Sequence, residues 1–299
     1  MKLSFTAFVT AAALAPLASA QEQDFSKVQI QTVDVAPGVH MLVGSGGNIG
    51  VSSGSDGVLL IDDQYAPLTE KIRAAVSAIS KHPLRFVVNT HWHGDHTGGN
   101  ENLGGAGAVI VAHENVRRRM STEQVSELFK RTTPASPKVA LPVVTFTEDV
   151  SFHVNGDELH VFHVDPAHTD GDSIVHWKNA NVFHMGDLFF SGGFPFIDLD
   201  SGGSVNGVIA AAEKVLALAN DASKIIPGHG PLATKKDLMA YRDMLEEIRT
   251  RIQTQITAGK TLDEIVASGP TKAWDDTLGK GFINGQRLTE TVYRSLTKK

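Results

Sequence analysis

Apolar and polar positions along the first third of the chain follow the pattern of short β-strands. Turn residues at 37–38 (Pro-Gly) and 55–57 (Ser-Asp-Gly) divide this region into separate strands. Beyond it, apolar residues recur at helical spacing from Pro67 to about Ser80. The pattern therefore predicts a meander or hairpin sheet followed by a helix. The predicted strands are residues 28–34, 39–43 and 48–62.

The middle of the chain alternates strand and helix signals. A buried-strand pattern at 84–89 leads into the polar, glycine-rich stretch 90–100. A strand at 108–112 and a helix starting at 113–120 follow, and the pattern then restarts near Val150. This order is typical of an α/β fold with two similar halves. In the second half we expect strands at 150–154, 158–164, 173–177, 181–185 and 223–226, with a helix at 204–219.

Two segments depart from this alternation. Residues 132–142 are rich in proline and predict an extended loop, either a lid or a crossover between the halves. The tail is helical, with a capping-box pattern at 261–264. We therefore expect a main domain over 21–234 and a helical extension over 235–299 packed on it. The apolar stripe of the tail consists of Leu238, Tyr241, Leu245, Ile248, Ile252 and Ile256.

The first twenty residues have the pattern of a secretory signal peptide. Lys2 precedes an apolar run from Phe5 to Leu17, and small residues at 18–20 come before Gln21. A membrane anchor is the alternative, but the run is shorter than the roughly 20 residues that a spanning helix needs. We predict cleavage after residue 20, a periplasmic or secreted protein, and no membrane span in the mature chain.

Charge and cysteine content narrow the function classes. The formal net charge is −6, and removal of residues 1–20, with one lysine and no acid, changes it from 27 − 33 to 26 − 33, which is −7. An acidic chain disfavours nucleic-acid partners, whose phosphates require lysine and arginine, so a small-molecule substrate is expected. The count of zero cysteines excludes disulfides, thiolate ligands and cysteine nucleophiles. The sequence leaves the oligomeric state open.

Candidate metal ligands cluster in the glycine-rich stretch and recur in three later segments. His91, His93, Asp95 and His96 lie within six residues directly after a predicted strand. Histidine and carboxylate together suit zinc. Ligands that arrive from several strand ends, beside glycine or proline, are typical of a preorganised metal site. The later candidates are His168 in Ala-His-Thr-Asp-Gly-Asp, Asp187 in Met-Gly-Asp-Leu and His229 in Pro-Gly-His-Gly-Pro.

These seven residues resemble the five-motif signature of the metallo-β-lactamase fold superfamily over about residues 30–230. The resemblance implies a four-layer αββα sandwich of two mixed β-sheets, with two Zn²⁺ ions per chain at one edge. By this resemblance, Asp187 bridges the metals and Asp95 also orients the nucleophile. One zinc is then held by His91, His93 and His168, and the other by Asp95, His96 and His229.

The activity that this resemblance implies is hydrolysis by a metal-bridging hydroxide. We expect a small cyclic amide or ester as substrate, with β-lactams the first candidate and a lactone or thioester the alternative. A metal-dependent binding or sensing protein without turnover is the alternative of another class. Asp187 stands where the best-known β-lactamases carry cysteine or serine, which argues against antibiotic hydrolysis as the main role. His93, where diiron relatives have glutamate, argues against redox chemistry.

Several other polar residues have two possible interpretations. Thr97, Asp170 and Asp172 either orient ligands or cap turns. The arginines at 117–119 either attract an anionic substrate or form a solvated helix face, which we favour. Residues 44–48 could form a flap and residues 194–196 an apolar wall. We interpret His113, His163, His176 and His184 as histidines that pack in the core or support ligands, and not as ligands.

Overall fold

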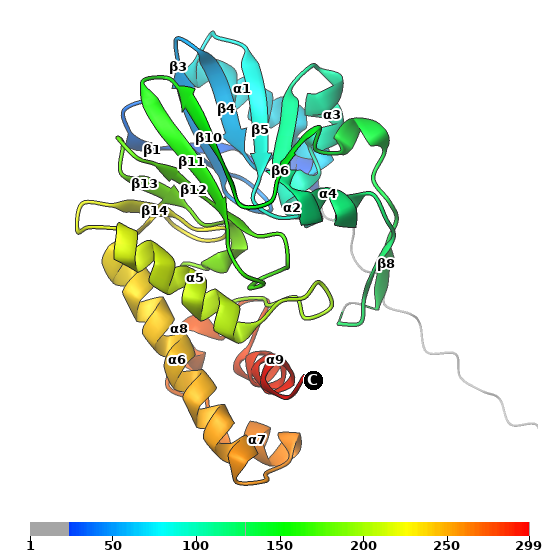
Figure 1. Ribbon diagram of the computed structural model, residues 1–299, viewed down its shortest axis with the longest axis vertical. Coiled ribbons are helices and arrows are strands. Elements are labelled where there is room, and N and C mark those ends of the chain that lie inside the picture. The colour runs from blue at the N-terminus through cyan, green and yellow to red at the C-terminus, as the bar shows by residue number, and fades with distance from the viewer. Residues whose placement is uncertain (1–23, 129, 299) are drawn as a thin grey trace, which may run out of the picture.

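Two β-sheets pack face to face, and helices cover both outer faces (Figure 1). The structure is a computed structural model that describes residues 24–128 and 130–298. The predicted signal peptide, residues 1–20, lies outside the described residues. The αββα fold class predicted from the sequence is confirmed.

The first sheet contains the strands of the N-terminal half. Strands β1, β2, β3 and β4 pair with their neighbours in antiparallel fashion. The next three pairs, β4–β5, β5–β6 and β6–β9, are parallel, so the sheet is mixed. Its order within the described chain is β1 (Gln31–Ala36), β2 (Val39–Val43), β3 (Ile49–Gly54), β4 (Gly57–Ile61), β5 (Leu84–Asn89), β6 (Val109–His113) and β9 (Val144–Phe146).

The second sheet contains the strands of the later half and is also mixed, because β13 and β14 pair in parallel. Between β6 and β9 in the sequence, β7 (Gln124–Ser126) and β8 (Arg131–Thr133) form a separate hairpin. The order of the second sheet in the described chain is β10 (Asp149–Val154), β11 (Asp157–His163), β12 (Ser173–Trp177), β13 (Val182–His184), β14 (Lys224–Ile226) and β15 (Ala233–Thr234).

Strand β4 is covered on both faces, which explains why its sequence is continuously apolar. Leu59 and Ile61 face the second sheet, where they join a core that includes Trp177. Val58 and Leu60 face the opposite way and pack in the core beneath α1. Because successive side chains of a strand point to opposite faces, a strand covered on both faces needs apolar residues at every position.

Helices cover the two outer faces (Figure 1). On the first sheet, α1 places Ile72 and Val76 against the strands. On the second sheet, α5 and α6 pack in one apolar cluster with Phe183. Capping boxes begin α6 and α7, as the second was predicted to do. The helices are α1 (Thr69–Ile79), α2 (Gly94–Thr97), α3 (Asn100–Gly105), α4 (Glu114–Met120), α5 (Val205–Leu218), α6 (Lys235–Thr257), α7 (Leu262–Ser268), α8 (Asp275–Leu278) and α9 (Gly285–Thr297).

The C-terminal helices share their core with the second sheet. Leu238 of α6 and Leu288 of α9 are fully buried in the same apolar cluster as Ile174 of β12. The boundary predicted at 234/235 stays a prediction. No helix in the described residues is long and apolar enough to span a membrane.

The turn predicted at 55–57 divides residues 48–62 into two strands, β3 and β4. Other local predictions differ from the structure. The predicted loop 132–142 contains the end of β8 and a 3-10 turn, Lys138–Ala140. The hairpin β7–β8 has three residues in each strand, which is too short for a periodic apolar pattern to reveal.

Candidate metal centre

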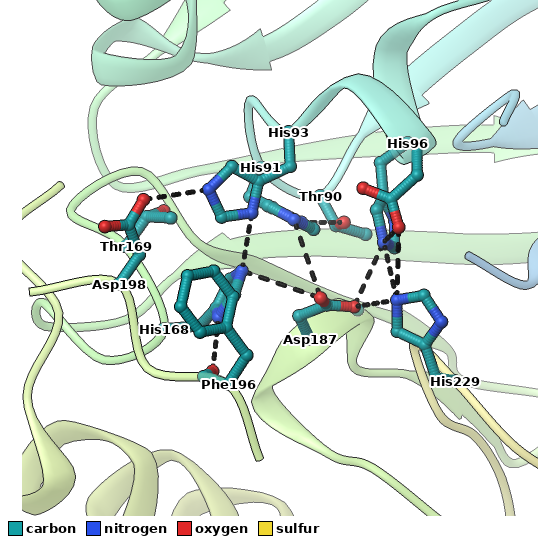
Figure 2. A network of polar contacts seen from close by, with 12 residues as sticks. Thr90, His91, His93, His96, His168, Thr169, Asp187, Phe196, Asp198 and His229 are labelled. Carbon is teal, nitrogen blue, oxygen red and sulfur yellow. Dashed lines mark hydrogen bonds and ion pairs between the residues drawn. The ribbon is translucent and has the colours of Figure 1, made fainter. Parts of the chain in front are cut away.

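The seven predicted ligands meet at one edge of the two sheets (Figure 2). His91 and His93 follow β5, and the short helix α2 supplies the next two ligands. His168 follows β11, Asp187 lies in the 3-10 turn after β13, and His229 follows β14. Strand ends from both sheets therefore converge on one small volume.

The ligand atoms form two groups. Site 1 consists of His91, His93, His168 and Asp187, and site 2 consists of Asp95, His96 and His229; within each group the candidate ligand atoms lie within 4.8 Å of one another. Asp187 faces both groups, because its Oδ2 lies 3.6 Å from His168 Nε2 and its Oδ1 lies 3.0 Å from His96 Nε2. Figure 2 shows its carboxylate between the two sets of rings.

The separations within site 1 suit a zinc ion. Two ligand atoms about 2.0–2.2 Å from a tetrahedral zinc lie about 3.3–3.6 Å apart. In site 1, His93 Nδ1 lies 2.9 Å from His168 Nε2, and His91 Nε2 lies 3.9 Å from Asp187 Oδ2. These distances bracket the expected value.

Backbone and carboxylate acceptors orient the rings of site 1. His168 donates its Nδ1–H to the Phe196 carbonyl at 2.8 Å, and His93 donates its Nε2–H to Asp198 at 2.9 Å. The remaining nitrogens of these two rings are then both acceptors, and they face each other. Two lone pairs at this distance repel unless a proton or a cation lies between them, so the arrangement favours a cation.

Asp62 connects the two sites. Its carboxylate accepts the backbone N–H of Thr90 at 2.8 Å, the Thr90 hydroxyl at 2.7 Å and the Nδ1–H of His96 at 2.7 Å. Because the Thr90 hydroxyl donates to Asp62, its oxygen accepts the Nδ1–H of His91 at 3.0 Å. The Nε2 lone pairs of His91 and His96 are thereby directed at the metal sites.

Charge differs between the sites. Burial lowers the pKa of His91 well below its usual range and lowers that of His168 to about 4, so both are neutral donors. Burial opposes protonation of His229 as well, but Asp187 and Asp95 outweigh it and raise the pKa to about 9. Asp187, Asp95 and Asp62 likewise raise the pKa of His96 against the effect of burial. Site 2 thus has an excess of negative charge that a divalent cation would satisfy.

Two buried atoms support metal binding directly. His91 Nε2 and Asp187 Oδ1 are buried without a hydrogen-bond partner in the described part of the chain. An unsatisfied buried polar atom costs about 1–3 kcal/mol, and a coordinated metal removes that cost. The residues present therefore fit a pair of metal ions with nitrogen and oxygen ligands.

Two glycines allow the ligands to pack this closely. A Cβ on Gly47 would lie 2.1 Å from His96 Cε1, and a Cβ on Gly228 would lie 2.1 Å from Asp187 Oδ1. Gly47 lies in the predicted flap 44–48, and its backbone also donates to the Asp95 carbonyl. This segment therefore supports the ligands of site 2 at close range.

A cavity of about 700 Å³ opens onto the metal centre. Asp95, Asp187, His93 and His229 lie in its wall. The predicted apolar wall is present in part, because Phe194 and Phe196 line the cavity. The aromatic lining consists of Tyr65, Trp92, Phe190, Phe194, Phe196 and Phe282.

The residues predicted to orient ligands act mainly through the backbone. Asp172 accepts the backbone N–H of His168 and of Thr169, and thus shapes the loop that carries the ligand. Thr97 donates to the His93 carbonyl within the turn of α2. Asp170 instead forms a bidentate ion pair with Arg119.

The remaining sequence interpretations concern arginines and histidines away from the centre. Arg118 is exposed as expected, but Arg119 is held by Asp170 and Arg117 by the Pro142 carbonyl. The face of α4 is therefore only partly solvated. Four histidines that we did not interpret as ligands belong to neither ligand group in the described chain. They are His113, His163, His176 and His184.

Sequence reasoning missed Asp62 and Asp198. Asp62 directly follows β4, as the ligands follow their strands, so its position carried a usable signal. Asp198 follows no strand, and its partner His93 lies more than 100 positions earlier in the sequence. No local pattern indicates such a pair.

Comparison with known families agrees with this geometry. Residues 44–229 match the Metallo-beta-lactamase superfamily, and the chain belongs to this superfamily. The two ligand groups agree with a metal-binding member of that superfamily.

The similar curated proteins are distant. The chain is 23% identical over 216 residues to the 2,4-dinitroanisole O-demethylase subunit alpha of Nocardioides sp. (strain JS1661), which covers 70% of this chain and 60% of that protein. It is 24% identical over 229 residues to the lactamase-like protein aptB of Emericella nidulans, a match that covers 72% of this chain and 65% of that protein. The chain thus matches less than two thirds of the length of these relatives.

Solved structures share the fold. The sec-alkylsulfatase Pisa1 from Pseudomonas sp. superimposes with a TM-score of 0.70 at 18% identity, over 90% of this chain and 50% of that one. A metallo-beta-lactamase from Pontibacter korlensis gives a TM-score of 0.59 at 21% identity, over 73% of this chain and 99% of that one. The first match extends beyond residue 234, because residues 1–234 are 234 of 299, which is less than 90%.

Proposed function

We propose that the chain is a dinuclear zinc hydrolase that cleaves a small cyclic amide or ester. The observation that carries the proposal is the pair of ligand groups that share Asp187 at the floor of an open cavity. Two zinc ions held there would lower the pKa of a water molecule and polarise the bond to be cleaved. The histidine and carboxylate donors, without cysteine, suit zinc.

The chain's own residues have separate roles in this proposal. Asp95 is the ligand carboxylate that lines the cavity with its side chain partly exposed, and its Oδ2 lies 3.4 Å from His229 Nε2. It can therefore accept a hydrogen bond from the attacking water and orient it. Asp62 and Asp198 fix the histidine rings of His96 and His93 by hydrogen bonds.

β-Lactams are the first substrates to test, and lactones and thioesters are the alternatives. A second candidate is a sulfate ester, which the extent of the alkylsulfatase similarity favours. That similarity reaches past residue 234, and Phe282 and Ile283 from this region line the cavity. We also propose that the protein is exported, on the basis of residues 1–20; a mature N-terminus at Gln21 in mass spectra of the native protein would test this.

A substrate panel tests the proposed function. Zinc-loaded protein is assayed with nitrocefin, an acyl-homoserine lactone, a thioester and a secondary alkyl sulfate, before and after chelation. We expect at least one substrate to be hydrolysed and chelation to abolish the activity. Protein that holds two zinc ions but hydrolyses no member would favour the binding or sensing alternative.

A further inference from the structure

The hairpin β7–β8 brings an arginine to the wall of the cavity. Arg131 is the only lysine or arginine among the described lining residues. Its guanidinium has no hydrogen-bond or ion-pair partner in the described chain, whereas Arg117 and Arg119 are held by protein groups. A cation at a cavity wall without a protein partner is available to a ligand.

The hairpin is fixed to the loops around the metal centre. Arg119 contacts both Asp170 and, at 3.0 Å, Gln124 of β7. The backbone N–H of Glu127 donates to Asp200 at 2.8 Å, two residues beyond the Asp198 that holds His93. The position of Arg131 is therefore linked to the ligand loops, although the hairpin itself lies outside both sheets (Figure 1).

An aromatic surface contributes the apolar part of the same cavity. Phe196 stacks on His93, and Phe190 stacks on His229 with ring planes 16° apart. Phe282, in the loop between α8 and α9, meets Phe196 edge to face at 6.1 Å and is 57% exposed. Two segments distant in the sequence, residues 190–196 and the loop that carries Phe282, thus line one cavity beside both metal sites.

We propose that the substrate is an amphipathic organic anion, whose apolar body packs on Phe196, Phe190 and Phe282 and whose anionic group binds Arg131. This inference rests on the proposed function, because it assigns a substrate class to the same site. Arg131 is then a specificity-determining residue. The bond to be cleaved lies at the metal centre, and the recognised anion lies at the hairpin.

Two fluorescent probes test this without turnover. 1-Anilinonaphthalene-8-sulfonate is an aromatic anion, and N-phenyl-1-naphthylamine is its neutral counterpart. Zinc-loaded wild type, Arg131→Met, Arg131→Lys and Phe282→Ala are titrated with each, and Arg118→Met, an exposed arginine on α4, is the matched control.

We expect Arg131→Met to weaken binding of the sulfonate about threefold to tenfold and to leave the amine unchanged, as for a partly exposed ion pair. Arg131→Lys should retain most of the sulfonate affinity, Phe282→Ala should weaken both probes, and Arg118→Met neither. Equal losses for both probes in Arg131→Met, no loss for the sulfonate, or unchanged binding in Phe282→Ala would overturn the proposal.

Kinetic assays with two ester substrates distinguish failure of this inference from failure of the proposed function. Mono-4-nitrophenyl glutarate carries a distal carboxylate, and 4-nitrophenyl valerate lacks it. Arg131→Met should raise KM for the glutarate ester about threefold to tenfold and leave that for the valerate ester unchanged. If neither ester nor any panel substrate is hydrolysed, the proposed function fails, whereas the probe titrations still decide the role of Arg131.

Discussion

Replacement of Asp62 by Asn should weaken metal binding although Asp62 is itself no ligand. Asn retains an oxygen for the Thr90 backbone N–H, but its NH₂ group stands in place of Oδ2 and can accept from neither the Thr90 hydroxyl nor His96 Nδ1, both of which lie 2.7 Å from Oδ2. The rings of His91 and His96 then lose the contacts that fix their tautomers. Loss of such supporting carboxylates costs about 10- to 100-fold in metal affinity.

The stability of the metal-free protein should fall as well. Two charge-assisted hydrogen bonds are lost at a fully buried position, and each contributes about 1.5–3 kcal/mol. Partial rearrangement leaves a loss of about 2–4 kcal/mol. At about 2–4 °C per kcal/mol for a chain of this size, the melting temperature should fall by about 5–15 °C.

Zinc titration against a chromophoric chelator and thermal melting measure the two effects. The matched control is Asp63→Asn, one residue further along the same loop. Asp63 is also fully buried, but its carboxylate accepts the backbone N–H of Gly99, and its contact with His96 is through the backbone, which the substitution leaves unchanged. Asp63→Asn should bind zinc as wild type does. Wild-type zinc affinity in Asp62→Asn, or an equal loss in both variants, would refute the reasoning.

Three further predictions concern catalysis, metal removal and pH. Asp95→Asn should lower kcat at least about 100-fold while zinc remains at site 1 by elemental analysis; full activity would contradict the role of Asp95. Chelation should lower the melting temperature, because zinc at about 1,000 times its Kd stabilises the fold by about 4 kcal/mol per ion; an unchanged melting curve after verified removal would contradict this. Burial lowers the pKa of His184 to about 4, although the nearby Asp62 carboxylate and the hydrogen bond to the Asn48 carbonyl act in the opposite direction. The unfolded chain therefore takes up a proton first as pH falls from about 6.5 to 4, and metal-free protein should lose up to roughly 3 kcal/mol there. Urea unfolding at several pH values should show a shallower acid slope for His184→Gln; an identical slope would contradict this account.

The predictable part of the metal centre is the part that strand ends carry. His91, His168 and His229 each lie in the loop after a strand with an apolar pattern, with glycine or proline nearby in the sequence, so their convergence follows from the sheet topology. Asp62 could have been found by the same rule, because it directly follows β4. We did not identify it because the search was for metal ligands, whereas Asp62 orients ligand side chains through hydrogen bonds.

The substrate side of the cavity was not predictable from local patterns. Arg131 lies in a hairpin with strands of three residues, and Phe282 lies in a loop of the C-terminal extension. Their meeting depends on how α8 and α9 pack against the domain, which is a long-range property. The tail was expected only to pack on the core, yet it also supplies part of the cavity wall.

The most direct measurement is an anomalous difference map at the zinc absorption edge, from crystals grown with zinc. The account predicts two peaks, one among His91, His93 and His168 and one among Asp95, His96 and His229, with Asp187 between them. A map from zinc-saturated protein that shows no peak at either of the two positions would contradict the account.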